Sequence, residues 1–174
     1  MPIDLVQIRS LAQRKEDENW RFRTFLKGRC KLESEELDEM VFAATQRVWA
    51  GIDCTTCANC CHELKPSFSA SDIERLAQRF GMEQQQVIER WMEPTEDRDE
   101  NPWQIRTTPC PFLVDRRCSI YEDRPADCQG YPYLDKPEFR SRLIGMLGRV
   151  EVCPIVYEVV EELKDETGFF RRRR

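Results

Sequence analysis

The sequence predicts a mainly α-helical protein in which a small cysteine-rich α+β domain follows an N-terminal helical hairpin. Three observations predict this fold class. Apolar residues recur at helical spacing through residues 1–50, four cysteines crowd residues 54–61, and four single cysteines follow at wider intervals. We expect a hairpin extension over residues 1–50, the cysteine-cluster domain over 51–166 and a basic tail over 167–174, with a bound metal stapling the domain.

The composition indicates a globular chain with a heavily charged surface. Hydrophobic residues make up 40% of the 174 residues and charged residues 34%, which is enough apolar material for one domain to bury a core. The net charge of −5 disfavours general attraction to nucleic acid or to an anionic membrane. Because no apolar run is long enough for a signal peptide or a membrane span, we expect a cytoplasmic protein.

Two amphipathic segments predict the N-terminal hairpin. Residues 3–27 are expected to form one helix that ends at Gly28, and residues 34–50 a second helix between an N-cap at Ser34 and a stop at Gly51. The second helix carries one apolar stripe, which comprises Leu37, Met40, Val41, Ala44 and Val48. This stripe predicts packing against the cysteine domain, and the hairpin also offers a surface to a protein partner.

Two further helices are predicted after the cysteine cluster. Ser69 and Ser71 each have an acidic residue three positions later, so either of them can begin the first helix with a capping box, and Gly81 ends it. Residues 84–92 are expected to form the second helix. Residues 93–102 are acidic and bounded by prolines, which is typical of an exposed loop.

The rest of the chain mixes short strands with two more helices. Residues 103–107 alternate apolar and polar side chains like a strand, and residues 112–114 and 119–121 are expected to form two strands about a turn. Helices are predicted over residues 138–147 and from Pro154 onward, since proline suits the first position of a helix.

The pattern of cysteines favours a metal centre. Thiols stay reduced in the cytoplasm, and nine cysteines, an odd number, do not suit a disulfide framework. Cys54, Cys57 and Cys60 have the spacing of the loops that wrap iron–sulfur cubes in bacterial ferredoxins, and Cys110 and Cys153 are each followed by proline. Soft thiolate ligands select iron–sulfur clusters, zinc or cuprous ions, and this triplet favours iron–sulfur slightly over zinc.

Zinc is the alternative, since eight cysteines suffice for two tetrahedral four-thiolate sites, or for one site with additional reactive thiols. Neighbouring side chains usually point apart, so Cys60 and Cys61 would have difficulty binding one ion. His62, the only histidine, could replace a thiolate but is more often a hydrogen-bonding neighbour. Cys30 has no cysteine near it in sequence and is expected to be a bystander.

The order of these motifs resembles a known family. The chain carries, over about residues 50–163, Cys-Thr-Thr-Cys-Ala-Asn-Cys-Cys, then Pro-Cys-Pro-Phe-Leu, then Cys-Ser-Ile-Tyr-Glu-Asp-Arg-Pro-Ala-Asp-Cys, then Tyr-Pro. This series looks like the YkgJ-like cysteine-cluster family, which is described as a zinc- or iron-chelating domain with a CxxCxxCC signature. The resemblance implies metal-ligand roles for Cys54, Cys57, Cys60, Cys61, Cys110, Cys118, Cys128 and Cys153.

The motif around Arg124 predicts a supporting role beside the ligands. Its guanidinium can donate hydrogen bonds to sulfur ligands or to Glu122 or Asp123, and Pro125 stiffens the approach to Cys128. An ordinary salt bridge is an equal alternative. Aromatic shielding of the metal is predicted from Tyr121, Tyr131 and Tyr133.

Three functions are consistent with these features: a redox iron–sulfur protein, a structural zinc module that binds a partner, and a nucleic-acid-associated protein. The third depends on Arg171–Arg174 together with Arg140, Arg142 and Arg149, and the negative net charge instead favours a solvated tail. Flagellin lysine N-methylases look like relatives with a similar cluster in a longer chain, but no donor-binding motif is present here. The sequence leaves enzymatic activity open.

Overall fold

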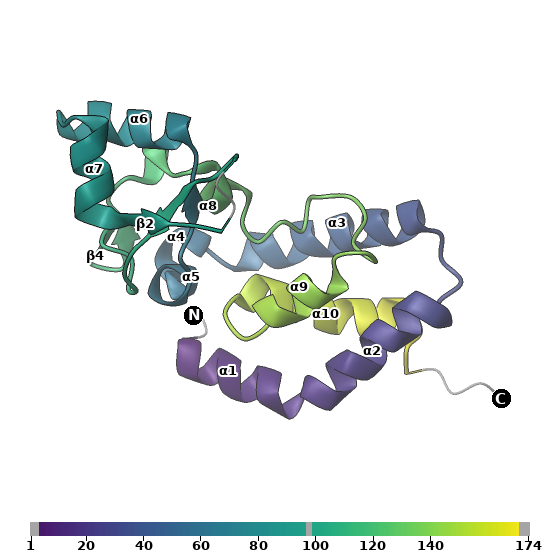
Figure 1. Cartoon of the computed structure of the whole chain (residues 1–174). Coiled ribbons are helices and arrows are strands. Elements are labelled where there is room, and N and C mark those ends of the chain that lie inside the picture. Colours follow the sequence, from purple (N-terminus) through teal and green to yellow (C-terminus); the bar gives the residue numbers. More distant parts are fainter. Residues whose placement is uncertain (1–3, 97–98, 171–174) are drawn as a thin grey trace. The chain divides into compact units, whose positions relative to one another are not determined.

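Two compact units make up the structure, a computed structural model in which residues 4–96 and 99–170 are described (Figure 1). The first unit comprises the chain up to Cys57 and from Pro132 onward, and the second comprises Ala58–Tyr131. The described residues form ten α helices, one short 3-10 helix and two small sheets. The predicted fold class, mainly α-helical with a small β component, is therefore confirmed, whereas the predicted boundaries of hairpin, domain and tail stay predictions.

The first unit is helical throughout its described secondary structure. Its described helices are α1 (Leu5–Arg14), α2 (Glu16–Gly28), α3 (Ser34–Gly51), α4 (Cys54–Cys57), α9 (Leu143–Arg149) and α10 (Pro154–Glu166). α10 packs against α3, α1 and α9, and α2 packs against α1 and α9. The stripe of α3 is buried as predicted, except that Met40 is half-buried. Proline opens α10 as predicted.

The first predicted helix is interrupted at Lys15, so one helix over residues 3–27 is wrong. Lys15 leaves helical geometry, with φ −104° and ψ 2°, and α2 begins at Glu16. The Lys15 ammonium forms ion pairs with Glu18 at 3.0 Å and with Glu161 of α10 at 3.2 Å. The second of these is a tertiary contact, which the local helical pattern does not contain.

The start of α3 differs from the prediction for a local reason. At α3, Glu33 rather than Ser34 is the N-cap, because the side chains of Glu33 and Glu36 each bond the other residue's backbone N–H. The stop at Gly51 is confirmed. A glutamate can therefore perform the reciprocal capping that serine usually performs.

The helix predicted over residues 138–147 begins later, at Leu143. Glu138 has a left-handed backbone with φ 61°, which excludes it from a helix. The carboxylate of Asp38 accepts hydrogen bonds from the N–H groups of Glu138 and Phe139 at 2.7 and 2.9 Å. This contact with α3 holds the preceding segment in a turn.

A three-stranded antiparallel sheet and two helices form the core of the second unit. β3 (Trp103–Ile105) pairs with both β1 (Ser67–Phe68) and β2 (Met92–Pro94), which confirms the predicted strand at β3. α6 (Ala70–Phe80) packs against α7 (Gln84–Trp91), as Figure 1 shows, and both were predicted. The main buried side chains of this core are Phe68, Ile73, Leu76, Val87, Met92, Ile105, Phe112 and Ile120.

A two-residue turn corrects the predicted hairpin after Cys110. β4 (Leu113–Val114) pairs with β5 (Arg117–Cys118), so the second strand lies earlier than predicted. Asp115 and Arg116 form the turn with φ of 48° and 64°, the positive values that match the twist of a tight hairpin. The chain then enters the 3-10 helix η1 (Tyr121–Asp123) where a strand was expected.

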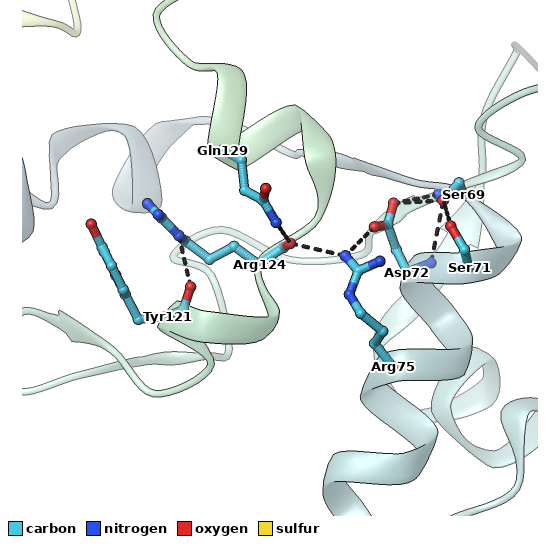
Figure 2. A network of polar contacts seen from close by, with 7 residues as sticks. All are labelled: Ser69, Ser71, Asp72, Arg75, Tyr121, Arg124 and Gln129. Atoms are coloured by element: carbon cyan, nitrogen blue, oxygen red, sulfur yellow. Dashed lines mark hydrogen bonds and ion pairs between the residues drawn. The ribbon is translucent and has the colours of Figure 1, made fainter.

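We expect Ser69→Ala to lower the free energy of unfolding of the protein by about 1 kcal/mol, because Ser69 caps α6. Its hydroxyl accepts from the N–H of Asp72 at 3.2 Å, and the Asp72 carboxylate accepts from the N–H of Ser69 at 2.9 Å (Figure 2). Ser71→Ala is the matched control and should change the stability by less than about 0.5 kcal/mol. Equal losses in urea denaturation of the two variants would contradict this assignment of the cap.

Candidate metal centre

Five of the eight predicted ligands lie in the second unit, on short elements. The second unit holds Cys60, Cys61, Cys110, Cys118 and Cys128. The first two belong to α5 (Asn59–Glu63) and the last to α8 (Ala126–Gly130). Cys110 lies in the segment before β4, and Cys118 is the last residue of β5. The predicted loop at the cluster is corrected to two short helices, α4 and α5, because the left-handed backbone of Ala58 (φ 59°) prevents one continuous helix.

Hydrogen bonds join these short elements within the second unit. The N–H of Cys110 donates to the carbonyl oxygen of Cys61 at 2.7 Å, which ties the hairpin to α5. The carboxylate of Asp127 accepts from the N–H of Ser67 at 2.8 Å, which ties α8 to β1. Cysteines that are far apart in sequence are thereby held in one region of the fold.

The thiols of this region act on one another electrostatically. Burial raises the pKa of Cys110, Cys118 and Cys128, and the charge of the Cys60 thiolate raises each of them further. Cys110 and Cys118 add to the rise at Cys128. Cys110 and Cys118 also pack against the same buried core of the second unit, so these thiols share one region within electrostatic reach of one another.

Cys60 and Cys61 form a hydrogen-bonded pair in which the two thiols differ in character. The hydrogen bond from Cys61 lowers the pKa of Cys60 to about 7, against the opposing effect of burial. The same hydrogen bond raises the pKa of Cys61, and burial and the charges of Cys60, Cys110 and Cys128 raise it further. Cys60 is therefore the thiol of this group most ready to become a thiolate at neutral pH.

The remaining predicted ligands, Cys54, Cys57 and Cys153, lie in the first unit. α4 carries the first two, and its start is shaped by Asp53, whose carboxylate accepts from the N–H and hydroxyl of Thr55 at 2.9 and 2.7 Å. Cys153 is the N-cap residue of α10. Cys57 and Cys153 are buried and Cys54 is half-buried. All three stay predicted ligands.

Several neighbouring residues were also given predicted roles. His62 is exposed at the end of α5, and Cys30 is half-buried just after α2. Tyr133 belongs to the first unit, where the Arg149 guanidinium lies 5.2 Å from its ring centre. Asp123, one of the alternative partners suggested for Arg124, instead pairs with Arg79 at 2.6 Å. The sequence pattern missed Arg79 because it lies on α6, far from the cysteine motifs in sequence.

The chemistry of this donor set fits a soft metal. All nine cysteines lie in the described part of the chain, and each is a thiol rather than half of a disulfide. Several sulfur atoms gathered in one partly buried region match the ligands that iron–sulfur clusters and zinc prefer. As the side chains lie, no group of three or more His, Cys, Asp or Glu in residues 4–96 and 99–170 is arranged to hold an ion, so binding requires the sulfur atoms to close onto a centre.

Comparison with protein families decides the assignment. The model of the CxxCxxCC family, described as "Putative zinc- or iron-chelating domain", matches residues 53–144. The chain belongs to this family. The family resemblance predicted from the motifs is confirmed, and membership of the CxxCxxCC family supports metal binding by this chain. The match contains every predicted ligand except Cys153. No curated protein and no solved structure matches this chain.

Two predictions concern parts of the chain outside the metal region. None of the helices formed by the described residues combines the length and apolar character needed to cross a bilayer. Of the arginines on which the nucleic-acid hypothesis depended, those at 171–174 lie outside the described residues. Arg140 and Arg142 lie within them and donate to the backbone carbonyl oxygens of Leu32 and Tyr133.

Proposed function

We propose that this CxxCxxCC-family protein binds a metal centre through cysteine thiolates and that the centre is an iron–sulfur cluster with a redox role. The observation that supports the proposal is the gathering of thiols in the second unit, where they raise one another's pKa. Such crowding is unfavourable for several thiolates by themselves, whereas a bound cation would stabilise them together. The proposed ligands are the eight cysteines of the family motifs.

The spacing of the first cysteines supports iron–sulfur as the kind of centre. Two residues separate Cys54 from Cys57, and two separate Cys57 from Cys60. The thiolates that bind one iron–sulfur cube in bacterial ferredoxins have the same spacing. A redox centre of this kind would function in the cytoplasm, where thiols stay reduced.

A structural zinc module is the second candidate, and the shortness of the metal region favours it. α5 and α8 have five residues each and β5 has two, so these elements have little stability of their own. Zinc sites with four thiolates staple such segments together and contribute directly to folding. In this role the helices of residues 1–50 would offer a surface to a protein partner.

Elemental analysis of protein purified without oxygen tests both candidates. We expect iron together with acid-labile sulfide, and an absorption shoulder near ~400 nm that zinc, with its filled d shell, does not produce. Colourless protein with stoichiometric zinc would reject the iron–sulfur proposal and support the structural zinc module. Protein that holds neither iron nor zinc, and takes up neither metal during anaerobic titration, would contradict metal binding itself.

A further inference from the structure

Positive charge is concentrated in the second half of α2 and in the residues that follow it. Residues 20–31, which we call the basic segment, contain five Arg and Lys side chains and no Asp or Glu, within a chain whose net charge is −5. Its cations are Arg21, Arg23, Lys27, Arg29 and Lys31. Among the described residues, no carboxylate forms an ion pair with any of the five. The net charge of the chain therefore conceals a local excess of positive charge.

The helix dipole explains only part of this charge. A helix favours cations in its last turn, where Lys27 lies. Arg21 and Arg23 lie in the middle of α2, too far from its end for this effect. The Nε of Arg21 donates to the backbone carbonyl oxygen of Asp17 at 3.3 Å, so Arg21 does not use the carboxylate four residues before it. The arginines in the middle of the helix need another explanation.

Exposed aromatic rings lie among these cations. Trp20 is 47% exposed, and the guanidinium carbon of Arg23 lies 5.8 Å from the centre of its ring. The exposed ring of Phe170 lies 5.0 Å from that of Phe169, which in turn lies 5.6 Å from the ring of Phe25 in the basic segment. The described chain therefore ends close to α2, and the next four residues in the sequence are all arginine.

The other side of α2 is already buried within the first unit, where Phe22 and Leu26 belong to the core. A helix that binds a membrane surface inserts its apolar face into the lipid, and α2 could not do this without unfolding the unit. The exposed side offers cations and single aromatic rings instead of a continuous apolar stripe. Nucleic acid matches this combination, because cations bind its phosphates and exposed rings stack on its unpaired bases.

We propose that the basic segment binds single-stranded nucleic acid, with its cations on the phosphates and Trp20 stacked on a base. Single strands are favoured over duplexes because the bases of a duplex are already stacked on one another. This binding goes beyond the proposed metal function and does not depend on it, since none of the side chains that carry it is a proposed metal ligand.

The role of the charges is tested in the full chain, purified without oxygen. Arg21→Gln/Lys27→Gln removes two cations from the basic segment. Arg116→Gln/Lys136→Gln is the matched control, since it removes one Arg and one Lys from exposed positions elsewhere. Fluorescence anisotropy measures the binding of labelled oligo(dT) and oligo(U) of about 15 nucleotides, from about 50 to about 200 mM KCl.

Each phosphate contact on a single strand contributes about 0.7 to the slope with which log affinity falls against log salt. We therefore expect Arg21→Gln/Lys27→Gln to lose about 1.4 of this slope and to bind about 10- to 100-fold more weakly at about 50 mM salt, whereas the control keeps both. Wild-type protein that binds neither oligonucleotide would overturn the inference, as would equal affinities of the two double variants.

The stacking is tested at Trp20. We expect Trp20→Ala to weaken binding of the single strand about 5- to 150-fold, whereas Trp20→Phe, which keeps a ring, retains most of the affinity. Trp49→Ala is the control and should bind like the wild type, since Trp49 is 41% exposed on α3 of the same unit. Unchanged affinity in Trp20→Ala, or equal losses in Trp20→Ala and Trp20→Phe, would overturn the stacking.

Two further ligands distinguish single strands from other polyanions. Duplex DNA of the same length should bind more weakly than the single strand, and vesicles of phosphatidylserine and phosphatidylcholine should not compete with it. Tighter binding of the duplex, or binding of the vesicles and of neither oligonucleotide, would overturn the inference. Metal content is measured separately by elemental analysis, so each of these failures leaves the proposed metal function standing.

Discussion

Replacing Cys60 with serine is expected to abolish metal binding and to remove much of the folded structure of Ala58–Tyr131 with it. The elements that carry the thiols of this unit are too short to be stable alone, so the centre would hold them in place. Structural zinc sites can contribute about 10–16 kcal/mol at neutral pH, which exceeds the typical stability of a domain of this size. Loss of one ligand would therefore be sufficient to unfold this unit.

Cys30→Ser is the matched control for this substitution. Cys30 and Cys60 are both half-buried thiols, so the change of sulfur to oxygen has a similar packing effect at the two positions. Metal content by elemental analysis and the thermal unfolding transition should be unchanged in Cys30→Ser. A Cys60→Ser protein that is well folded and fully metallated would contradict both its ligand role and the coupling of metal to folding.

Replacing Lys164 with alanine is expected to lower the free energy of unfolding of the first unit by about 3–5 kcal/mol. Lys164 is 0% exposed, and its ammonium donates to Glu18 at 2.8 Å and also to Glu161. Lys15 bridges the same two carboxylates, at 3.0 and 3.2 Å. Alanine at position 164 would leave a cavity, and the carboxylates of Glu18 and Glu161 would then share the single ammonium of Lys15.

A second variant separates the charge from the cavity. Lys164→Met keeps most of the volume, and adding Glu18→Gln to it removes one carboxylate that has lost its partner. The double variant should recover part of the stability lost in Lys164→Met when the two are compared by urea denaturation. If the double variant is no more stable than the sum of the two single changes predicts, the four charges of Lys15, Glu18, Glu161 and Lys164 do not form the coupled group described here.

The same group predicts a loss of stability in acid. Burial raises the pKa of Glu18, but the hydrogen bonds from Lys164 and Lys15 outweigh it, and the net result is a pKa below the ordinary value of 4.5. Because the folded-state pKa is depressed, this contribution is fully present above pH 4.5 and is lost as the pH falls through the folded value. Glu18→Gln should therefore unfold more easily than the wild type at neutral pH, and the difference should shrink in acid.

Helices that are specified by neighbouring residues could be predicted from the sequence. α6 was predicted because capping residues and a terminal glycine flank its apolar periodicity, and Gly81 indeed takes the left-handed conformation (φ 61°) at the end of α6. Errors arose where a distant residue decides the backbone. Asp38 holds the segment before α9 in a turn, and Lys15, where the first predicted helix is interrupted, pairs with Glu161 of α10.

The sequence by itself determined the family, the mainly α-helical class and the residues proposed as metal ligands, since regular cysteine spacing is a property of the chain alone. Only the tertiary structure decided which charges act on those thiols. The charges of Arg79 and Arg124 both oppose the rise in the pKa of Cys118, and Arg79 also pairs with Asp123. Electrostatic influence depends on distance in space, and spacing along the sequence does not record the folded positions that set that distance.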